Sequence, residues 1–158
     1  MNICFRAMRA ADVVRIAELE RICFRSPWSE TSIRGELRNK LAHYQVVESD
    51  GAIIAYAGMW VFLGEAHITN VAVDPEYRRQ GIGRALMLHM MKTALSYNAS
   101  AMTLEVREHN EAAKSLYFQL GFEKAGVRKG YYSDTGEAAW ILWQHDISAM
   151  VDSEAAQC

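Results

Sequence analysis

The chain has 158 residues, 51% of them hydrophobic, which is long enough for one buried core and too short for two ordinary domains. A net charge of −2 provides no field that would attract nucleic acid or an anionic membrane surface, so we expect neither as a partner. No apolar run approaches the ~20 residues of a membrane span, and the first residues lack the apolar core of a signal peptide. We therefore expect a cytoplasmic protein.

The cysteines and histidines predict neither a disulfide framework nor a metal site. Cys4, Cys23 and Cys158 are odd in number and widely spaced, which favours reduced thiols. Cys4 and Cys23 are expected to pack in the core, as free cysteines usually do. The histidines lack the close spacing of zinc ligands; they are His43, His67, His89, His109 and His145.

The first quarter of the chain reads as a strand and two helices. Residues 2–8 alternate as in a strand, and residues 9–24 carry apolar side chains at helical spacing. Pro27 stops that helix. Ser29 is a good N-cap for a second helix, and Glu30 is well placed near its positive end.

Three strands follow. Residues 43–49 and 52–62 are rich in β-formers and are separated by Asp50-Gly51, a pair that favours a tight hairpin turn. A further strand at 66–74 ends at Pro75, and the pattern becomes helical from Gly81. The motif "DPEYRRQGIGRAL" therefore lies at a strand-to-helix junction.

The last third predicts a strand, a helix and a closing hairpin. Residues 101–106 form the strand, Asn110 can cap a helix over 111–120, and Gly121 can close it in the left-handed conformation. Residues 122–132 and 138–147 form the hairpin, and a frayed tail is expected from Ser148. The order indicates an α/β domain around one sheet.

The glycine junction suits a diphosphate. A helix start offers unpaired N–H groups and a positive dipole end, and Gly81 and Gly83 allow close backbone approach. Cationic contacts can come from Arg78, Arg79 and Arg84. The alternative is a plain turn with solvated arginines. A dinucleotide fold is less well supported, because Leu86 occupies the third glycine position, and no Gly-Lys-Ser or Gly-Lys-Thr completes a P-loop.

The segment "VAVDPEYRRQGIGRALM" resembles the acyl-CoA-binding signature of the GNAT superfamily of N-acetyltransferases, Arg/Gln-x-x-Gly-x-Gly/Ala, at Arg78, Gly81 and Gly83. "LEVREHNEAAKSLYFQLGF", "SPWSE" and "RKGYYSDTGEAAWIL" resemble blocks of the RimI type, which acetylates protein N-terminal amines. The resemblance implies one GNAT domain over residues 1–147. It also implies a single mixed, mostly antiparallel, twisted seven-stranded sheet with splayed central strands, flanked by four helices.

The same resemblance implies the binding residues for the cosubstrate, acetyl-CoA. The backbone of Val71, Ala72 and Val73 would bind the pantetheine arm. Asn110 matches a position that contacts CoA, a role compatible with helix capping. Arg78, which begins the signature, is a further CoA-binding residue. The pyrophosphate would lie on the stretch Arg79, Gln80, Gly81, Ile82, Gly83 and Arg84.

Two residues match the catalytic positions of the family. Glu105 matches the general base, and burial in its apolar strand would raise its pKa toward the working range. The alternative is a strand carboxylate paired with Arg107. Tyr117 matches the general acid that protonates the CoA sulfur, and the alternative is a half-buried helix aromatic. Direct attack is favoured over a covalent intermediate, because no cysteine lies in these motifs.

The resemblance implies a protein N-terminus as the acceptor, above all the N-terminal alanine of a small-subunit ribosomal protein. The candidates for binding the acceptor peptide are Trp28, Tyr131 and Tyr132. The alternative is that they are amphipathic side chains packed at the rim of the acceptor channel. Two alternatives stay open: an N-acetyltransferase for another protein or small-molecule amine, and a non-catalytic acyl-CoA-binding interaction module.

Overall fold

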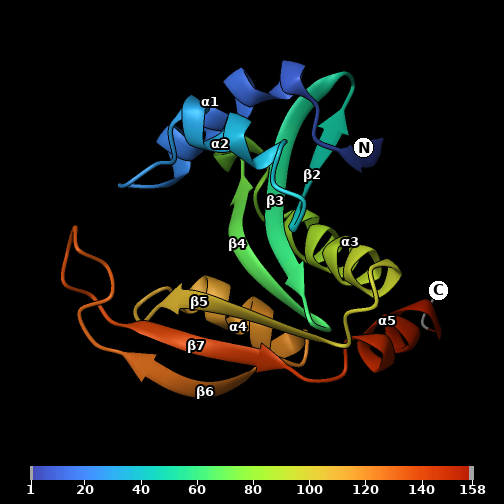
Figure 1. The fold of residues 1–158 in the computed structure, drawn as a ribbon, viewed down its shortest axis with the longest axis vertical. Coiled ribbons are helices and arrows are strands. Elements are labelled where there is room, and N and C mark those ends of the chain that lie inside the picture. Colours follow the sequence, from blue (N-terminus) through green and yellow to red (C-terminus); the bar gives the residue numbers. More distant parts are fainter. Residues whose placement is uncertain (1, 157–158) are drawn as a thin grey trace. The chain divides into compact units, whose positions relative to one another are not determined.

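The computed structural model describes residues 2–156 and contains a seven-stranded sheet in the order β1-β2-β3-β4-β5-β7-β6 (Figure 1). The strands are β1 (Ile3–Ala7), β2 (Ala42–Ser49), β3 (Ala52–Phe62), β4 (Glu65–Val73), β5 (Ala101–Arg107), β6 (Glu123–Arg128) and β7 (Ala139–Gln144). The helices are α1 (Val13–Cys23), α2 (Glu30–Glu36), α3 (Ile82–Ser96), α4 (Glu111–Gln119) and α5 (Ile147–Ala156), with short 3-10 turns η1 (Ala10–Asp12) and η2 (Pro75–Tyr77). The predicted order up to β7 is confirmed.

The chain forms two compact units. One holds the residues up to Trp60 together with Thr69–Met90, and the other holds Val61–Ile68 together with the residues from Met91 onward. Strands β3 and β4 and helix α3 therefore contribute to both units.

In the first unit, β2 pairs antiparallel with both β1 and β3. Asp50 and Gly51 both have positive φ, 51° and 83°, which confirms the predicted hairpin turn. Ser29 caps α2 by accepting a hydrogen bond from the Ser32 N–H at 3.1 Å, also as predicted. The core of this unit is a buried apolar cluster: Met8, Val13, Ile16, Ala17, Leu19, Ile33, Tyr44, Val46, Ile53, Tyr56 and Ala72.

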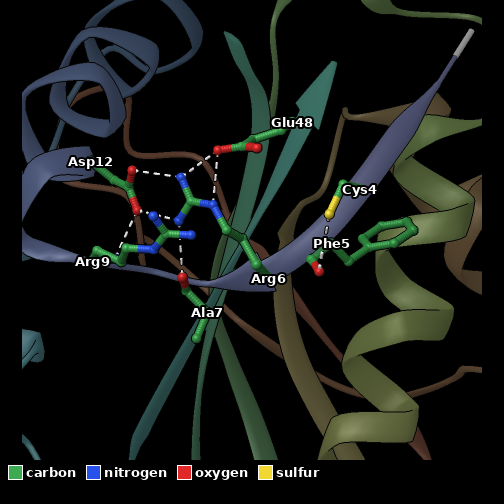
Figure 2. Close-up of polar contacts among 7 residues, drawn as sticks. All are labelled: Cys4, Phe5, Arg6, Ala7, Arg9, Asp12 and Glu48. Carbon is green, nitrogen blue, oxygen red and sulfur yellow. Dashed lines mark hydrogen bonds and ion pairs between the residues drawn. The ribbon is translucent and has the colours of Figure 1, made fainter. Parts of the chain in front are cut away.

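Arg6 on β1 makes hydrogen bonds to two neighbouring elements of this unit. Figure 2 shows the Arg6 guanidinium between Asp12, reached by two hydrogen bonds of 2.8 and 2.9 Å, and Glu48, reached at 2.6 Å. The hydrogen bond from Arg6 holds the pKa of Asp12 below its usual value despite burial. The pair of contacts fixes β1 against β2 and against the turn that leads into α1.

In the second unit, β7 lies between β5 and β6 and pairs antiparallel with both. Strand β5 alternates strictly, with Met102, Leu104 and Val106 buried and the intervening side chains half-buried. Helix α4 covers the buried face, since Lys114 and Phe118 contact the ring of Trp140 and the Leu120 carbonyl accepts from Gln144. The half-buried side chains of β5, Glu105 among them, lie on its other face.

The parallel pairing of β4 with β5 joins Glu65–His67 to Ala101–Thr103, three residues of strands that are nine and seven residues long. A short pairing of this kind is what splayed central strands require. The splay itself stays a prediction.

The C-terminal segment differs from the expected frayed tail and adds a fifth helix to the predicted four. Asp146 accepts a hydrogen bond from the Ala149 N–H at 3.1 Å, as an N-cap does, and Ile147 is fully buried. The cap and this apolar anchor explain why α5 forms. Residues 157–158 of the predicted tail lie outside the described residues.

Candidate active site

The glycine motif forms the predicted junction between β4 and α3. Asp74 ends the strand and accepts hydrogen bonds from the Glu76 N–H at 3.0 Å and from Arg15 at 2.7 Å. Gly81 has φ of 78°, a value that favours glycine, and α3 begins at the next residue. A Cβ at Gly81 would meet no atom within 4 Å, so the space above the loop is open.

The three arginines of this motif have different surroundings. Arg78 turns back onto the protein: its Nε donates to the Val73 carbonyl at 3.2 Å and its Nη2 to Cys23 Sγ at 3.5 Å. Arg79 is exposed and has a positive φ of 62°. Arg84 is half-buried in the first turn of α3. Arg78 thus shapes the loop, while Arg79 faces solvent.

The residues predicted to bind CoA between Val71 and Arg84 all belong to the first unit. Ala72 is buried in the core, whereas Val71 and Val73 are half-buried on the opposite side of β4. Gln80 and Gly81 are exposed, and Ile82 is buried. The N-terminal turn of a 15-residue helix beside an open glycine fits a diphosphate.

Glu105 lies on the half-buried face of β5, with 16% of its side chain exposed, and its Oε2 lies 2.7 Å from Nε2 of His67 on β4. His67 is the register partner of Thr103, so the parallel pairing brings His67 to the same face as Glu105. No local signal in the sequence predicts this contact, because the two residues are 38 positions apart.

This pairing reverses the expected shift of the carboxyl group. Burial raises the pKa of Glu105, but the hydrogen bond from His67 and the positive charges of His67 and Arg128 outweigh it. The pKa of Glu105 therefore lies below its ordinary value, and the prediction of a raised pKa is wrong. The hydrogen bond to Glu105 raises the pKa of His67 despite partial burial.

Arg107 is not the ion-pair partner of Glu105 in the structure. Its guanidinium pairs with Asp134 at 2.8 Å and with Glu137 at 3.3 Å, both in the segment between β6 and β7. The alternative interpretation of Glu105, a carboxylate held by Arg107, is replaced by the pair with His67.

Tyr117 lies on α4, the helix that covers the opposite face of β5 from Glu105, and only 8% of it is exposed. Its ring packs against Phe122 with the centroids 5.7 Å apart. Burial, with a smaller contribution from Tyr132, raises its pKa to about 12. The phenol therefore keeps its proton throughout the neutral range.

The candidate acceptor residues lie in different surroundings. Trp28 packs against the core of the first unit, and its backbone N–H donates to the buried Glu20 carboxylate at 2.9 Å. Tyr131 is exposed and meets Tyr132 edge-on, with the centroids 5.0 Å apart. Burial raises the pKa of Tyr132 to about 12. Tyr132 interacts electrostatically with both Glu105 and Tyr117, so it lies near both.

Asn110 has the predicted structural role, because its side chain caps α4 by accepting from the Ala113 N–H at 3.1 Å. Gly121 closes the same helix with φ of 86°, again as predicted.

The described cysteines do not both pack in the core. Cys4 is exposed on β1, so its prediction is wrong, while Cys23 is half-buried against the core cluster. Burial raises the pKa of the Cys23 thiol, although Arg78 opposes this. Cys158 lies outside the described residues.

Within residues 2–156, no three or more His, Cys, Asp or Glu side chains are grouped so that they could hold a metal ion. No helix in that part of the chain has the length and apolarity needed to cross a membrane.

Comparison with known proteins agrees with this arrangement. The model of the acetyltransferase (GNAT) family matches residues 13–122. A Bacillus subtilis (strain 168) protein named as a putative ribosomal protein bS18-alanine N-acetyltransferase is 41% identical over 139 residues, which are 87% of this chain and 92% of the relative. The crystal structure of the ribosomal-protein-S18-alanine N-acetyltransferase from Escherichia coli superposes with a TM-score of 0.83 at 33% identity, covering 90% of this chain and 92% of the other.

The fold also extends to more distant proteins. Arabidopsis thaliana NAA60 in complex with acetyl-CoA has a TM-score of 0.82 at 18% identity, covering 90% of this chain and 97% of that one, a likeness in fold alone. From the family match and the close relatives, the chain belongs to the acetyltransferase (GNAT) family.

Proposed function

We propose that the protein transfers the acetyl group of acetyl-CoA to the N-terminal α-amine of a protein, with the N-terminal alanine of a small-subunit ribosomal protein as the leading acceptor. The observation that carries this proposal is the similarity to the Bacillus subtilis relative, which extends over 92% of that protein. The GNAT domain proposed over residues 1–147 would act in the cytoplasm, where such acceptors are made.

Acetyl-CoA supplies an activated acetyl thioester. The chain's own contribution to binding it is the strand Val71–Val73 for the pantetheine arm and residues 78–84 for the diphosphate, with Asn110 as a further CoA contact. The open space at Gly81 and the first turn of α3 support this assignment.

Acyl transfer requires a neutral amine and a protonated leaving group. Glu105 would accept the proton of the acceptor ammonium, and its low exposure protects the carboxylate from bulk water. Tyr117 would give its proton to the CoA thiolate. A phenol with a pKa of about 12 is a weak acid toward a thiolate with a conjugate acid near ~8.5, so this transfer needs a close approach of the two groups.

Direct attack of the amine on the thioester is favoured over an acetyl-enzyme. Cys23 is half-buried, its pKa is raised, and its sulfur contacts the Val73 carbonyl and Arg78. Such a thiol is a poor nucleophile.

The properties of Glu105 also favour an α-amine over a lysine. An α-ammonium has a pKa of ~7.7 to 8.0 and a lysine ~10.4, so a neutral lysine costs about 3.4 kcal/mol more at one pH. Since the pKa of Glu105 lies below its ordinary value, this carboxylate is a weak base and suits the more acidic ammonium.

The test is acetyl-CoA consumption with short peptides that differ in their first residue, beside N-terminally blocked lysine peptides and a polyamine. We expect activity on free N-termini only, strongest with alanine. Activity confined to blocked lysine peptides or the polyamine would replace the acceptor, and CoA binding without turnover on any amine would favour an interaction module.

A further inference from the structure

The contact between His67 and Glu105 is a short polar contact between the proposed base and a side chain of the neighbouring strand. Their side chains meet at 2.7 Å, from two strands that run parallel and are 38 residues apart in the sequence. His67 is the more open partner, with 40% of its side chain exposed against 16% for Glu105. The contact therefore holds a largely buried carboxylate against a more exposed imidazole.

We propose that His67 is a positioning residue for the base: its Nε2–H anchors Oε2 of Glu105 and leaves Oε1 as the oxygen that takes the proton of the acceptor ammonium. This inference rests on the proposed function.

The direction of the hydrogen bond follows from the carboxyl group. An ionised carboxylate can only accept hydrogen bonds, so the proton between the two atoms must belong to Nε2 of His67. The lowered pKa of Glu105 and the raised pKa of His67 agree with this assignment, because each charge favours the other. His67 therefore offsets the cost of burying the carboxylate.

The proton balance is simple. One N–H bond of the acceptor ammonium breaks, and its proton joins Oε1 of Glu105. The freed lone pair forms the new bond to the acetyl carbon, the C–S bond breaks, and Tyr117 gives its proton to the departing thiolate. As the amide forms, its nitrogen loses a second proton, which passes through water to the Tyr117 phenolate, and Glu105 releases its own proton to water. His67 keeps its own Nε2–H throughout.

Other charged and titratable groups face this pair. Arg128 on β6 lowers the pKa of both Glu105 and His67. Tyr132 interacts with Glu105, and Glu65 precedes His67 on the same side of β4. Arg107 follows Glu105 on the same side of β5 but pairs with Asp134 and Glu137. Arg128 stays in place in the variants below, so the change they report comes from His67.

The experiment compares His67→Ala, which removes the donor, with His67→Gln, which keeps an N–H donor but does not titrate. Each is assayed for kcat and KM with an alanine-terminated peptide between pH ~3.5 and ~9, a range that begins below the ~4.3 of an ordinary glutamate. We expect His67→Ala to lower kcat about tenfold or more, because a misplaced base is a poor one. The acidic limb of kcat/KM should move to higher pH, and the KM for acetyl-CoA should not change.

His67→Gln should recover most of the lost kcat, since the amide can still hold Oε2. The control is His109→Gln, which removes a histidine whose side chain is 80% exposed and lies 3.8 Å from Glu108. It should leave the profile unchanged.

A second readout needs no substrate. Titration of the Glu105 carboxyl carbon by NMR should show a higher pKa in His67→Ala than in the unaltered protein. An active His67→Ala with an unmoved Glu105 titration and an unmoved acidic limb would overturn the inference. Loss of kcat in both variants with the limb in place would assign His67 a structural role and overturn it too. An unaltered protein inactive on every free N-terminus would overturn the proposed function, and the base role with it, even if the NMR shift were found.

Discussion

The guanidinium of Arg107 lies over the ring of Tyr132, with its central carbon 3.9 Å from the ring centroid. The same guanidinium pairs with Asp134 and Glu137, and the Tyr132 N–H donates to the Glu137 carbonyl at 3.1 Å. One side chain at the end of β5 thus fixes the shape of the segment between β6 and β7. If Tyr132 contacts the acceptor, Arg107 determines the position of the Tyr132 ring.

Replacing Tyr132 by alanine should raise the KM for a peptide acceptor about tenfold, because the loss of one aromatic contact is worth about 1.4 kcal/mol. Arg107→Met should raise the same KM by releasing the segment. The KM for acetyl-CoA should stay constant in both, as it should in the surface control Lys92→Met. Steady-state kinetics with the alanine-terminated peptide measure this.

The double variant refines the same prediction. If Arg107 acts through Tyr132, then Arg107→Met should add little to the acceptor KM once Tyr132 is alanine. Additive effects would show that the two residues act independently, and an unchanged KM in Tyr132→Ala would remove Tyr132 from the acceptor site.

Tyr117→Phe should lower kcat by about a hundredfold, since general-acid catalysis contributes at least that much, while the affinity for CoA stays nearly the same. The ring remains to pack against Phe122, so the fold should be kept. Turnover and calorimetric CoA binding are measured side by side, with Tyr97→Phe, an exposed position just after α3, as the control. Unchanged turnover would exclude Tyr117 from the reaction.

The same tyrosine should make the protein sensitive to alkali. The pKa of Tyr117 is about 12 in the fold against 10.0 for the free side chain, so the unfolded chain loses this proton first. The contribution of Tyr117 to the free energy of unfolding is complete below pH ~10 and is lost as the pH rises through about 12. The full contribution is about 3 kcal/mol. Burial of Tyr44 and Tyr56 raises their pKa values and acts in the same direction.

Urea unfolding between pH 8 and 12, a range that brackets the ordinary tyrosine pKa of ~10, should show a falling free energy of unfolding. Tyr117→Phe should flatten part of that fall. Parallel curves for the two proteins would mean that Tyr117 titrates alike in both states.

The elements of this fold could be predicted because their signals are local. Ser29 and Asn110 cap helices through bonds to residues three positions away, and Asp50-Gly51 needs only its own backbone to turn. The cap of α5 at Asp146 is an equally local signal, but the small and polar residues that follow it favour a frayed tail.

The environment of Glu105 could not be predicted in the same way. The register of two parallel strands places His67 beside Glu105. The partners of Arg107 follow it in the sequence by 27 and 30 residues. Alternation indicates which residues share a face of one strand, but it does not indicate which residue of the neighbouring strand stands opposite. The predicted pKa of Glu105 was wrong for that reason.

Gly81 allows a direct test of the diphosphate site, because Gly51 in the same unit has a similar positive φ. Their φ angles are 78° and 83°, and a Cβ at either would meet no atom within 4 Å. Alanine should therefore cost each position about 1 kcal/mol of stability through backbone strain alone.

Gly81→Ala should also raise the KM for acetyl-CoA about tenfold or more, since the added methyl occupies the space next to the first turn of α3. Gly51→Ala should leave that KM unchanged, as the Asp50-Gly51 turn has no part in the proposed site. Urea unfolding and acetyl-CoA kinetics on both variants separate the two effects. Equal KM values for acetyl-CoA in the two variants would show that Gly81 does not bind the diphosphate and serves only the turn.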